Sequence, residues 1–160
     1  MAEHAHGAPP QIRPQRLADY LEVMSKAVFQ SGISWAVIEK KWAGTREAFH
    51  GFDPGRLADL TPDDVDALLR DSRIIRNRRK VEGIVHNARA LMDIEAGRGF
   101  RDYLRSFEDY EALASDMKRR FKFLGDMGVY YFLWVVSEPV PDYEEWRRRH
   151  GIREMPPRKR

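Results

Sequence analysis

The stretch FKFLGDMGVYYFLWVV, residues 121–136, decides the fold. Gly125 interrupts a strongly apolar passage, as glycine does where a chain turns. Residues 129–136 are almost wholly apolar, which is typical of a helix that runs through a protein core. The pair Val135-Val136 alone would suit a strand, but the sequence contains no partner segment with alternating polarity. The stretch therefore predicts a helix, a hairpin and a second helix within an all-α, compact helical domain.

Helical periodicity continues on both sides of this stretch. Between Arg16 and Gln30, apolar residues recur at intervals of three and four, as on the buried face of a helix. Ser34 is expected to cap a second helix, and Gly44 to end it. Asp53 and Thr61 each precede a proline, which is a strong signal for the start of a helix. The remaining predicted helices span residues 54–60, 62–70, 81–94, 100–107, 106–120 and 143–150.

Length and composition predict one domain with two tails. A chain of 160 residues suits a single hydrophobic core. Residues 1–14 contain three prolines and few large apolar side chains, so we expect a disordered N-terminal tail. Residues 15–151 carry the predicted helices and form the domain, and residues 152–160 form a basic C-terminal tail.

The charge pattern favours an anionic partner. The net charge is +3 and the pI about 9.3, with basic residues gathered between Arg73 and Lys80. The chain has no cysteine, which excludes disulfide bonds and thiolate-bound zinc or iron–sulfur clusters. No apolar run approaches the roughly 20 residues of a membrane span, and residues 1–14 do not read as a signal peptide. We therefore expect a cytoplasmic protein.

Three blocks of the sequence resemble one enzyme family. They are VFQSGISWAVIEKKWAGTREAFHGFD at residues 28–53, IIRNRRKVEGIVHNARAL at 74–91, and FKFLG at 121–125 with Tyr130 and Phe132 beyond it. In this order they resemble the DNA-3-methyladenine glycosylase I family. The resemblance implies a helix-hairpin-helix DNA glycosylase of base excision repair, which flips an alkylated purine out of the duplex and hydrolyses its N-glycosidic bond. We expect no cofactor.

The resemblance assigns base binding to aromatic residues. Trp35 matches the family's pocket tryptophan in the GxSW motif, and an indole attracts a cationic alkylated base through its ring quadrupole. The alternative is that Trp35 is simply a core residue. The other pocket candidates, which also have a core role as their alternative, are Phe29, Gln30, Tyr130 and Tyr131.

Two segments are expected to contact the DNA backbone. The hairpin matches the family's DNA-clamping turn, where backbone N–H groups bind phosphate, and its candidate residues are Lys122, Phe123 and Gly125. A second basic cluster supplies further phosphate contacts, with a solvated surface as the alternative interpretation. This cluster consists of Arg73, Arg76, Arg78, Arg79 and Lys80.

The catalytic carboxylate is expected at Asp142. Helix-hairpin-helix glycosylases in general use an aspartate a short distance beyond the hairpin to stabilise the developing oxocarbenium ion, and Asp142 lies at a similar place. Asp142 is also suited to cap the last helix, and the two roles are compatible.

The chain departs from the family pattern at two points. Well-studied members bind zinc through two cysteines and two histidines, whereas this chain has no cysteine and has Tyr143 where the second histidine is expected. We therefore expect no metal site. The glutamate that binds the flipped adenine is expected eight residues before Trp35, where Ala27 stands. Either another group such as Gln30 reads the base, or specificity has changed, or the chain only binds DNA.

Two other functions stay open beside the glycosylase. A catalytically silent relative that recognises lesions or bent DNA would show salt-sensitive binding without release of a base. A protein-interaction scaffold would have its arginines spread around the surface instead of gathered beside the hairpin. For the glycosylase, the expected partner is double-stranded DNA with an alkylated base, and the expected form is a nucleoid-associated monomer with no membrane contact.

Overall fold

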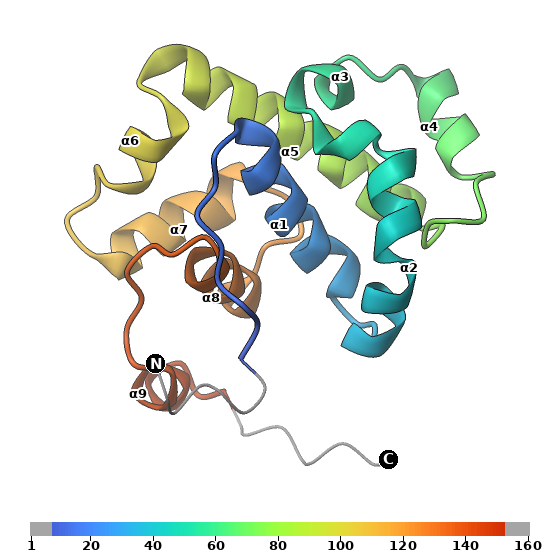
Figure 1. The fold of residues 1–160 in the computed structure, drawn as a ribbon. Helices are drawn as coiled ribbons and strands as arrows, with labels where there is room; N and C mark the ends of the chain where they lie inside the picture. The colour runs from blue at the N-terminus through green and yellow to red at the C-terminus, as the bar shows by residue number, and fades with distance from the viewer. Residues whose placement is uncertain (1–7, 153–160) are drawn as a thin grey trace.

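The computed structural model describes residues 8–152, and within that range it contains helices and no strands (Figure 1). This confirms the predicted all-α fold class. In chain order the elements are α1 (Leu17–Gln30), α2 (Trp35–Ala48), the 3-10 helix η2 (His50–Phe52), α3 (Pro54–Ala58), α4 (Pro62–Leu68), α5 (Arg78–Gly97), α6 (Phe100–Leu104), α7 (Tyr110–Arg120), α8 (Asp126–Val135) and α9 (Tyr143–Arg149).

Helices α1, α5 and α8 form the centre of the molecule (Figure 1). α1 packs against both α5 and α8, and α2 and η2 pack on another side of α1. The short helix α3 lies across α5, and α7 lies beside α8. α9 lies at the edge of the molecule, next to the end of the described chain (Figure 1). The central helices thus carry both the α1–α2 turn and the hairpin before α8.

An aromatic cluster fixes α2 against α1. Phe29 of α1 meets the ring of Trp42 of α2 edge-on, with ring centroids 6.2 Å apart. Trp42 stacks on Phe52 at 5.4 Å, and Phe52 stacks on Phe49 at 5.3 Å. All four rings are buried. Buried aromatic pairs of this kind stabilise a core beyond their area alone, so the second half of α2 is held in a defined position relative to α1.

Side-chain caps begin several helices where the sequence predicts them. Ser34 accepts a hydrogen bond from the backbone N–H of Val37 at 3.3 Å at the start of α2. Thr61, predicted to start a helix, forms a capping box with Asp64 at the start of α4. Each cap satisfies backbone N–H groups that the first turn of a helix leaves without a partner.

The end of α2 differs from the prediction. The helix continues through Gly44 to Ala48, because Gly44 is the point at which the side chain of Arg73 approaches the helix. A Cβ atom at Gly44 would lie 3.0 Å from the Cβ atom of Arg73. The glycine thus permits a close contact between segments and does not end the helix.

Two helix starts also differ from the prediction. α5 begins at Arg78, where the side chain of Asn77 accepts from the N–H of Lys80 at 3.1 Å. α7 begins only after Asp109, which caps it by accepting from the N–H of Ala112 at 2.9 Å. The connector between α4 and α5 therefore ends at Asn77, and the last residues of the basic run belong to α5.

Residues 8–14, predicted to lie in the N-terminal tail, are docked on the end of α8. The indole N–H of Trp134 donates to the carbonyl of Pro9 at 2.9 Å, and the N–H of Ile12 donates to the carbonyl of Val135 at 2.7 Å. The guanidinium of Arg101 donates to the carbonyl of Pro14 at 2.9 Å. Residues 1–7 and 153–160 lie outside the described residues.

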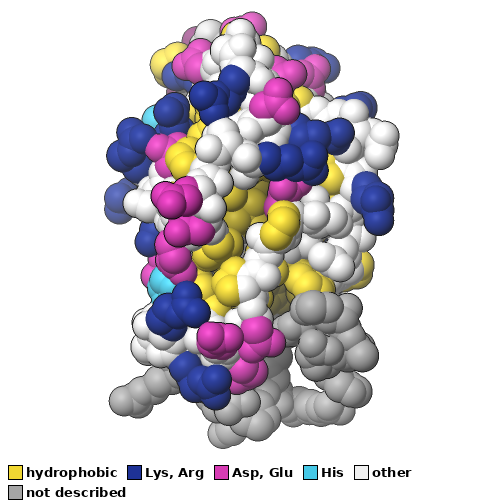
Figure 2. Space-filling view, turned by 90° about the vertical axis from the view of Figure 1, so that its left-hand side faces the viewer, with side chains coloured by type: hydrophobic (Ala, Val, Ile, Leu, Met, Phe, Trp, Pro, Cys, Tyr) yellow, Lys and Arg dark blue, Asp and Glu magenta, His cyan; other side chains and the backbone are white. Residues whose placement is uncertain are grey.

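One face of the described chain carries side chains of mixed charge and polarity. Figure 2 shows one face, where basic and acidic side chains lie close together around a hollow that exposes apolar side chains. Over residues 8–152, no helix has both the length and the apolarity needed to span a bilayer. The face in Figure 2 is thus not uniformly basic.

Candidate nucleic-acid interface

Trp35 and Tyr131 form an aromatic pair between α2 and α8. Trp35 is the first residue of α2, directly after the Ser34 cap, and Tyr131 lies in the middle of α8. Their ring centroids are 4.9 Å apart and their planes are tilted by 35°. Both side chains are only partly buried. The pair thus presents aromatic surface at the turn between α1 and α2.

The turn that carries Trp35 is built from polar contacts. Gly32 has a φ of 79°, which favours glycine at this position. The side-chain amide of Gln30 donates to the carbonyl of Ile33 at 3.3 Å, across the turn. Gln30 is half-buried. Because its amide nitrogen already donates to Ile33, its side-chain oxygen is the group that can accept a hydrogen bond from a ligand.

Two pocket candidates face other parts of the molecule. Phe29 is 1% exposed and belongs to the aromatic cluster between α1 and α2. Tyr130 is buried, and its hydroxyl donates to the carbonyl of Pro141 at 2.6 Å while its ring lies 4.5 Å from that of Trp146. Neighbouring residues on a helix point about 100° apart. Of the two tyrosines, the structure therefore brings Tyr131 to Trp35 and turns Tyr130 toward α9.

Two pairs of opposite charge connect α1 with α2 beside the aromatic pair. Lys26 of α1 forms an ion pair with Glu39 of α2. Glu22 forms an ion pair with Arg46 at 2.6 Å and also accepts from the indole N–H of Trp42 at 2.8 Å. The ammonium of Lys26 lies 5.4 Å from the centroid of the Trp42 ring.

The two carboxylates of these ion pairs raise the pKa of Tyr131 in the aromatic pair. Burial raises the pKa of Tyr131, and the negative charges of Glu39 and Glu22 raise it further. Sequence reasoning missed both carboxylates. The available signal was their spacing, because Glu22, Lys26 and Gln30 repeat every four residues on α1 and Glu39 follows Trp35 by four on α2.

The hairpin between α7 and α8 is held by a side-chain clamp from α5. Asn87 is 1% exposed and binds both backbone groups of Lys122, accepting from its N–H at 2.7 Å and donating to its carbonyl at 3.1 Å. Phe123 has a φ of 60°, unusual for a residue with a side chain. A Cβ atom at Gly83 would lie 2.8 Å from the ring of Phe123, so α5 needs glycine there.

One arginine of the basic cluster lies beside the hairpin. The guanidinium of Arg79 lies 6.0 Å from the centroid of the Phe123 ring, and a cavity of about 230 Å³ adjoins it. The cavity is lined by Arg79, Glu82, Gly83, His86, Lys122 and Phe123. Arg79 and Lys122 therefore line the same cavity, and two cations there suit a phosphate-binding surface.

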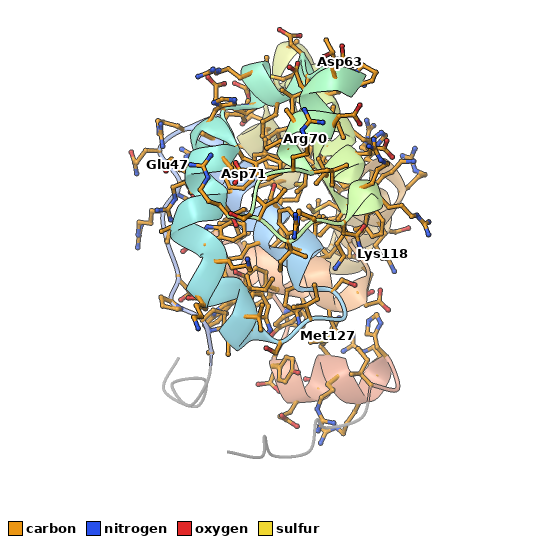
Figure 3. All side chains as sticks on the ribbon, turned by 90° about the vertical axis from the view of Figure 1, so that its right-hand side faces the viewer. Glu47, Asp63, Arg70, Asp71, Lys118 and Met127 are labelled. Carbon is orange, nitrogen blue, oxygen red and sulfur yellow. The ribbon has the colours of Figure 1, made fainter. Side chains whose placement is uncertain are left out.

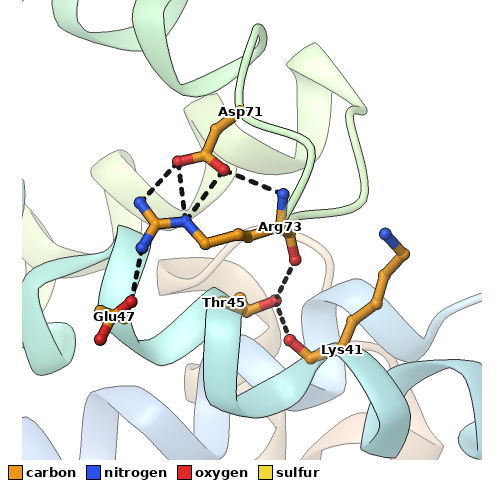
Figure 4. Close-up of polar contacts among 5 residues, drawn as sticks. All are labelled: Lys41, Thr45, Glu47, Asp71 and Arg73. Atoms are coloured by element: carbon orange, nitrogen blue, oxygen red, sulfur yellow. Dashed lines mark hydrogen bonds and ion pairs between the residues drawn. The ribbon is translucent and has the colours of Figure 1, made fainter.

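Arg73 is held by acidic residues, as Figure 4 shows. Its guanidinium binds the carboxylate of Asp71 at 2.7 Å and that of Glu47 at 2.7 Å, while its carbonyl accepts from the hydroxyl of Thr45 at 3.4 Å. Hydrogen bonds from Arg73 lower the pKa of Asp71 to about 2. Glu47 and Asp71 approach one another from different elements, far from Lys118 of α7 (Figure 3). Arg73 thus ties the connector to α2.

The other members of the cluster differ in availability. Lys80, predicted to contact phosphate, is instead 6% exposed, and its ammonium donates to the carbonyls of Phe29 and Ser31 at 3.0 and 2.6 Å. Burial lowers its pKa. It binds the C-terminal carbonyls of α1, and the prediction was wrong because α5 begins early enough to bury it. Arg78 is paired with Asp66 at 2.5 Å, and Arg76 is exposed.

Asp142 caps α9, accepting from the N–H of Glu145 at 3.1 Å. The residue itself is exposed. Burial raises the pKa of Tyr130 to about 12, and the charge of Asp142 contributes to that shift. The cap predicted from the sequence is thus confirmed, and it leaves the second carboxylate oxygen for another interaction.

Aromatic side chains pack together at the position where the family resemblance implies a zinc site. Tyr143, at the position expected for a histidine ligand, packs against Tyr130 at 5.4 Å and Trp146 at 6.0 Å. Residues 8–152 contain no group of three or more histidine or acidic side chains placed to hold a metal ion. His150 instead contacts Glu111 at 3.3 Å and Asp126 at 3.5 Å. The side chains at this place do not fit a zinc ion.

Comparisons with known proteins agree with this architecture. A family model for methyladenine glycosylases matches residues 13–120. The DNA-3-methyladenine glycosylase of Haemophilus influenzae is 35% identical, over 65% of this chain and 68% of that protein. DNA-3-methyladenine glycosylase 1 of Escherichia coli is 34% identical, over 65% of this chain and 67% of that protein.

Solved structures show the same fold. A crystal structure of 3-methyladenine DNA glycosylase I superposes with a TM-score of 0.69 at 31% identity, covering 78% of this chain and 81% of that one. A variant of such an enzyme in complex with 3-methyladenine superposes with a TM-score of 0.69 at 27% identity, covering 84% of both chains. The chain belongs to the methyladenine glycosylase family.

Proposed function

We propose that the protein is a DNA glycosylase of base excision repair that removes alkylated purines, 3-methyladenine above all, from double-stranded DNA. The observation that carries the proposal is the partly exposed Trp35 at the α1–α2 turn of a chain that belongs to the methyladenine glycosylase family. One solved relative is bound to 3-methyladenine, which supports the choice of base. We take residues 15–151 as the catalytic domain.

The departing base needs no strong general acid from the protein. Alkylation at N3 makes the adenine cationic, so the base accepts the electron pair of the broken N-glycosidic bond and leaves as a neutral molecule. A water molecule then adds to C1′ of the sugar and loses a proton. The protein must flip the nucleotide, hold the base and stabilise positive charge on the sugar. We assign the last role to Asp142, which lies beyond the hairpin in the loop before α9.

Base binding requires a rearrangement or an outer stacking face. The Trp35 and Tyr131 rings are 4.9 Å apart, whereas a base between two rings needs about 7 Å, two contacts of about 3.5 Å each. A flipped base therefore stacks on the free face of Trp35, or Tyr131 rotates away to admit it. Gln30, beside the turn, offers its side-chain oxygen to the edge of the base.

The hairpin and Arg79 form the proposed contact with the DNA backbone. Lys122 and Arg79 supply charge, while Phe123 and Gly125 shape the turn that leads into α8. Arg76 is exposed and extends this surface. Arg73 and Arg78 contribute less, because carboxylates already bind them. We expect one molecule to act on a duplex, as a nucleoid-associated cytoplasmic monomer.

The test is a single-turnover incubation of excess protein with methylated duplex DNA, with free 3-methyladenine and 7-methylguanine measured. The wild type is expected to release base above the spontaneous rate. Trp35→Ala should lower the rate by about 5- to 150-fold, since stacking of a base on an aromatic ring contributes about 1–3 kcal/mol. Trp35→Phe should fall between, and Met92→Ala, an exposed residue of α5, serves as the control.

Ala27 favours the alternative of a catalytically silent DNA-binding relative, because this small buried residue stands where the family glutamate is expected. That alternative predicts salt-sensitive binding of duplex DNA with no release of base from any methylated site. Such a result would overturn the proposed function.

A further inference from the structure

The base site lacks a carboxylate at the expected position. Ala27 is 5% exposed and offers no polar group. α8 also passes close to it, because a Cβ atom built on Gly128 would lie 4.0 Å from the Cβ atom of Ala27. A cationic base stacked on Trp35 therefore needs its negative partner from another residue.

Glu39 is placed to supply that charge. It follows Trp35 by four residues on α2, so the two side chains lie on the same face of the helix, one turn apart. In addition to burial, its negative charge raises the pKa of Tyr131, whose ring contacts Trp35. The Glu39 side chain is 61% exposed, so a ligand can reach it.

The other polar side chains considered near the aromatic pair, Glu22 and Gln30, are less suited to bind a cationic base. Glu22 is 23% exposed and accepts from Trp42 and from two nitrogens of Arg46, at 2.8, 2.7 and 2.6 Å. Gln30 is neutral and cannot balance a positive charge. Of the two carboxylates that act on Tyr131, Glu39 is the more exposed, at 61% against 23% for Glu22.

A cation already occupies the place beside Glu39. The ammonium of Lys26 pairs with the Glu39 carboxylate and lies 5.4 Å from the centroid of the Trp42 ring. A carboxylate and an indole face are the two features that bind a delocalised organic cation. The Lys26 pair thus shows that Glu39 binds a cation on this face of α2, next to Trp42 and one turn away from Trp35.

We propose that Glu39 is the specificity-determining carboxylate of the base site, and that it exchanges Lys26 for the cationic purine stacked on Trp35. The inference rests on the proposed function and names the acceptor for the exocyclic amine of the base. Lys26 keeps Glu39 oriented while the site is empty and competes with the base when it is filled.

Two substitutions of the ion pair separate this role from a structural one. Glu39→Gln keeps an acceptor and removes the charge, and it should weaken binding of free 3-methyladenine and slow its release from methylated DNA by at least about tenfold. Lys26→Met keeps the aliphatic stem and removes the competitor, so it should tighten binding of 3-methyladenine. A structural ion pair would make both variants change in the same direction.

The measurements are the Kd of free 3-methyladenine from quenching of tryptophan fluorescence and the single-turnover rate of base release. Glu144→Gln is the matched control, because Glu144 is 56% exposed and also pairs with an arginine, on α9. Thermal unfolding of all variants reports whether each one folds.

The outcomes distinguish the two proposals. Release of base by the wild type, with Glu39→Gln as fast as Glu144→Gln, would overturn the role of Glu39 and leave the proposed function standing. No release by the wild type, with binding of 3-methyladenine weakened by Glu39→Gln and strengthened by Lys26→Met, would overturn the proposed function and support the role of Glu39. Neither release nor binding by the wild type would overturn both.

Discussion

Asn87 fastens the hairpin to α5, so Asn87→Ala is expected to destabilise the proposed DNA clamp. In the variant both the N–H and the carbonyl of Lys122 lose their partner, and these bonds measure 2.7 and 3.1 Å in the structure. A lost hydrogen bond at a partly buried group costs about 1–2 kcal/mol. We therefore expect the free energy of unfolding to fall by about 2–4 kcal/mol, or roughly 5–15 °C in Tm for a domain of this size.

Urea denaturation followed by circular dichroism measures this change. Met92→Ala, an exposed position on the same helix, should shift the free energy of unfolding by less than about 0.5 kcal/mol. Fluorescence anisotropy with a labelled duplex should show affinity lowered about fivefold, because the loosened hairpin must be ordered on binding. A variant with unchanged stability would refute the clamp, and lowered stability with unchanged affinity would remove the hairpin from the DNA contact.

Two further predictions concern aspartates. Asp142→Asn should leave stability nearly unchanged, because asparagine also caps helices, and should slow base release by about 100-fold or more in the single-turnover assay; equal rates would leave Asp142 as a cap alone. Arg73 lowers the pKa of Asp71 from 3.8 to about 2, so the stabilisation is complete above pH 3.8 and is lost as the pH falls through 2. The difference in unfolding free energy between wild type and Asp71→Asn should shrink between pH 6 and pH 2, and a constant difference would contradict the pairing.

The helices were predictable because each carries its own pattern. The caps Ser34, Thr61 and Asp142 and the apolar run of α8 act locally, and the structure confirms them. Gly44 was misread, since its role is set by Arg73, which lies 29 residues further along the chain. A glycine that ends a helix and one that admits a neighbouring segment look the same in sequence.

The candidate site was predictable only in part, for a related reason. Trp35 could be identified from its motif, but the direction in which a side chain points depends on packing. That separates Tyr131, beside Trp35, from Tyr130, which contacts α9. Lys80 reads as one more cation in a basic run, and only the fold shows that it binds the end of α1. Cross-helix pairs such as Lys26 and Glu39 need two helices to be placed before they can be recognised.

The docking of residues 8–14 bears on how the chain folds during synthesis. The hydrogen bond between Trp134 and Pro9 joins residues 125 positions apart, and Tyr20 of α1 meets Phe132 of α8 at 6.2 Å. A ribosome delivers the N-terminus first. Helices α2 and α5 cover part of α1 earlier, but the side of α1 that faces α8 stays exposed until α8 has been made. Closure of the core around α8 is therefore expected to be a late step in synthesis.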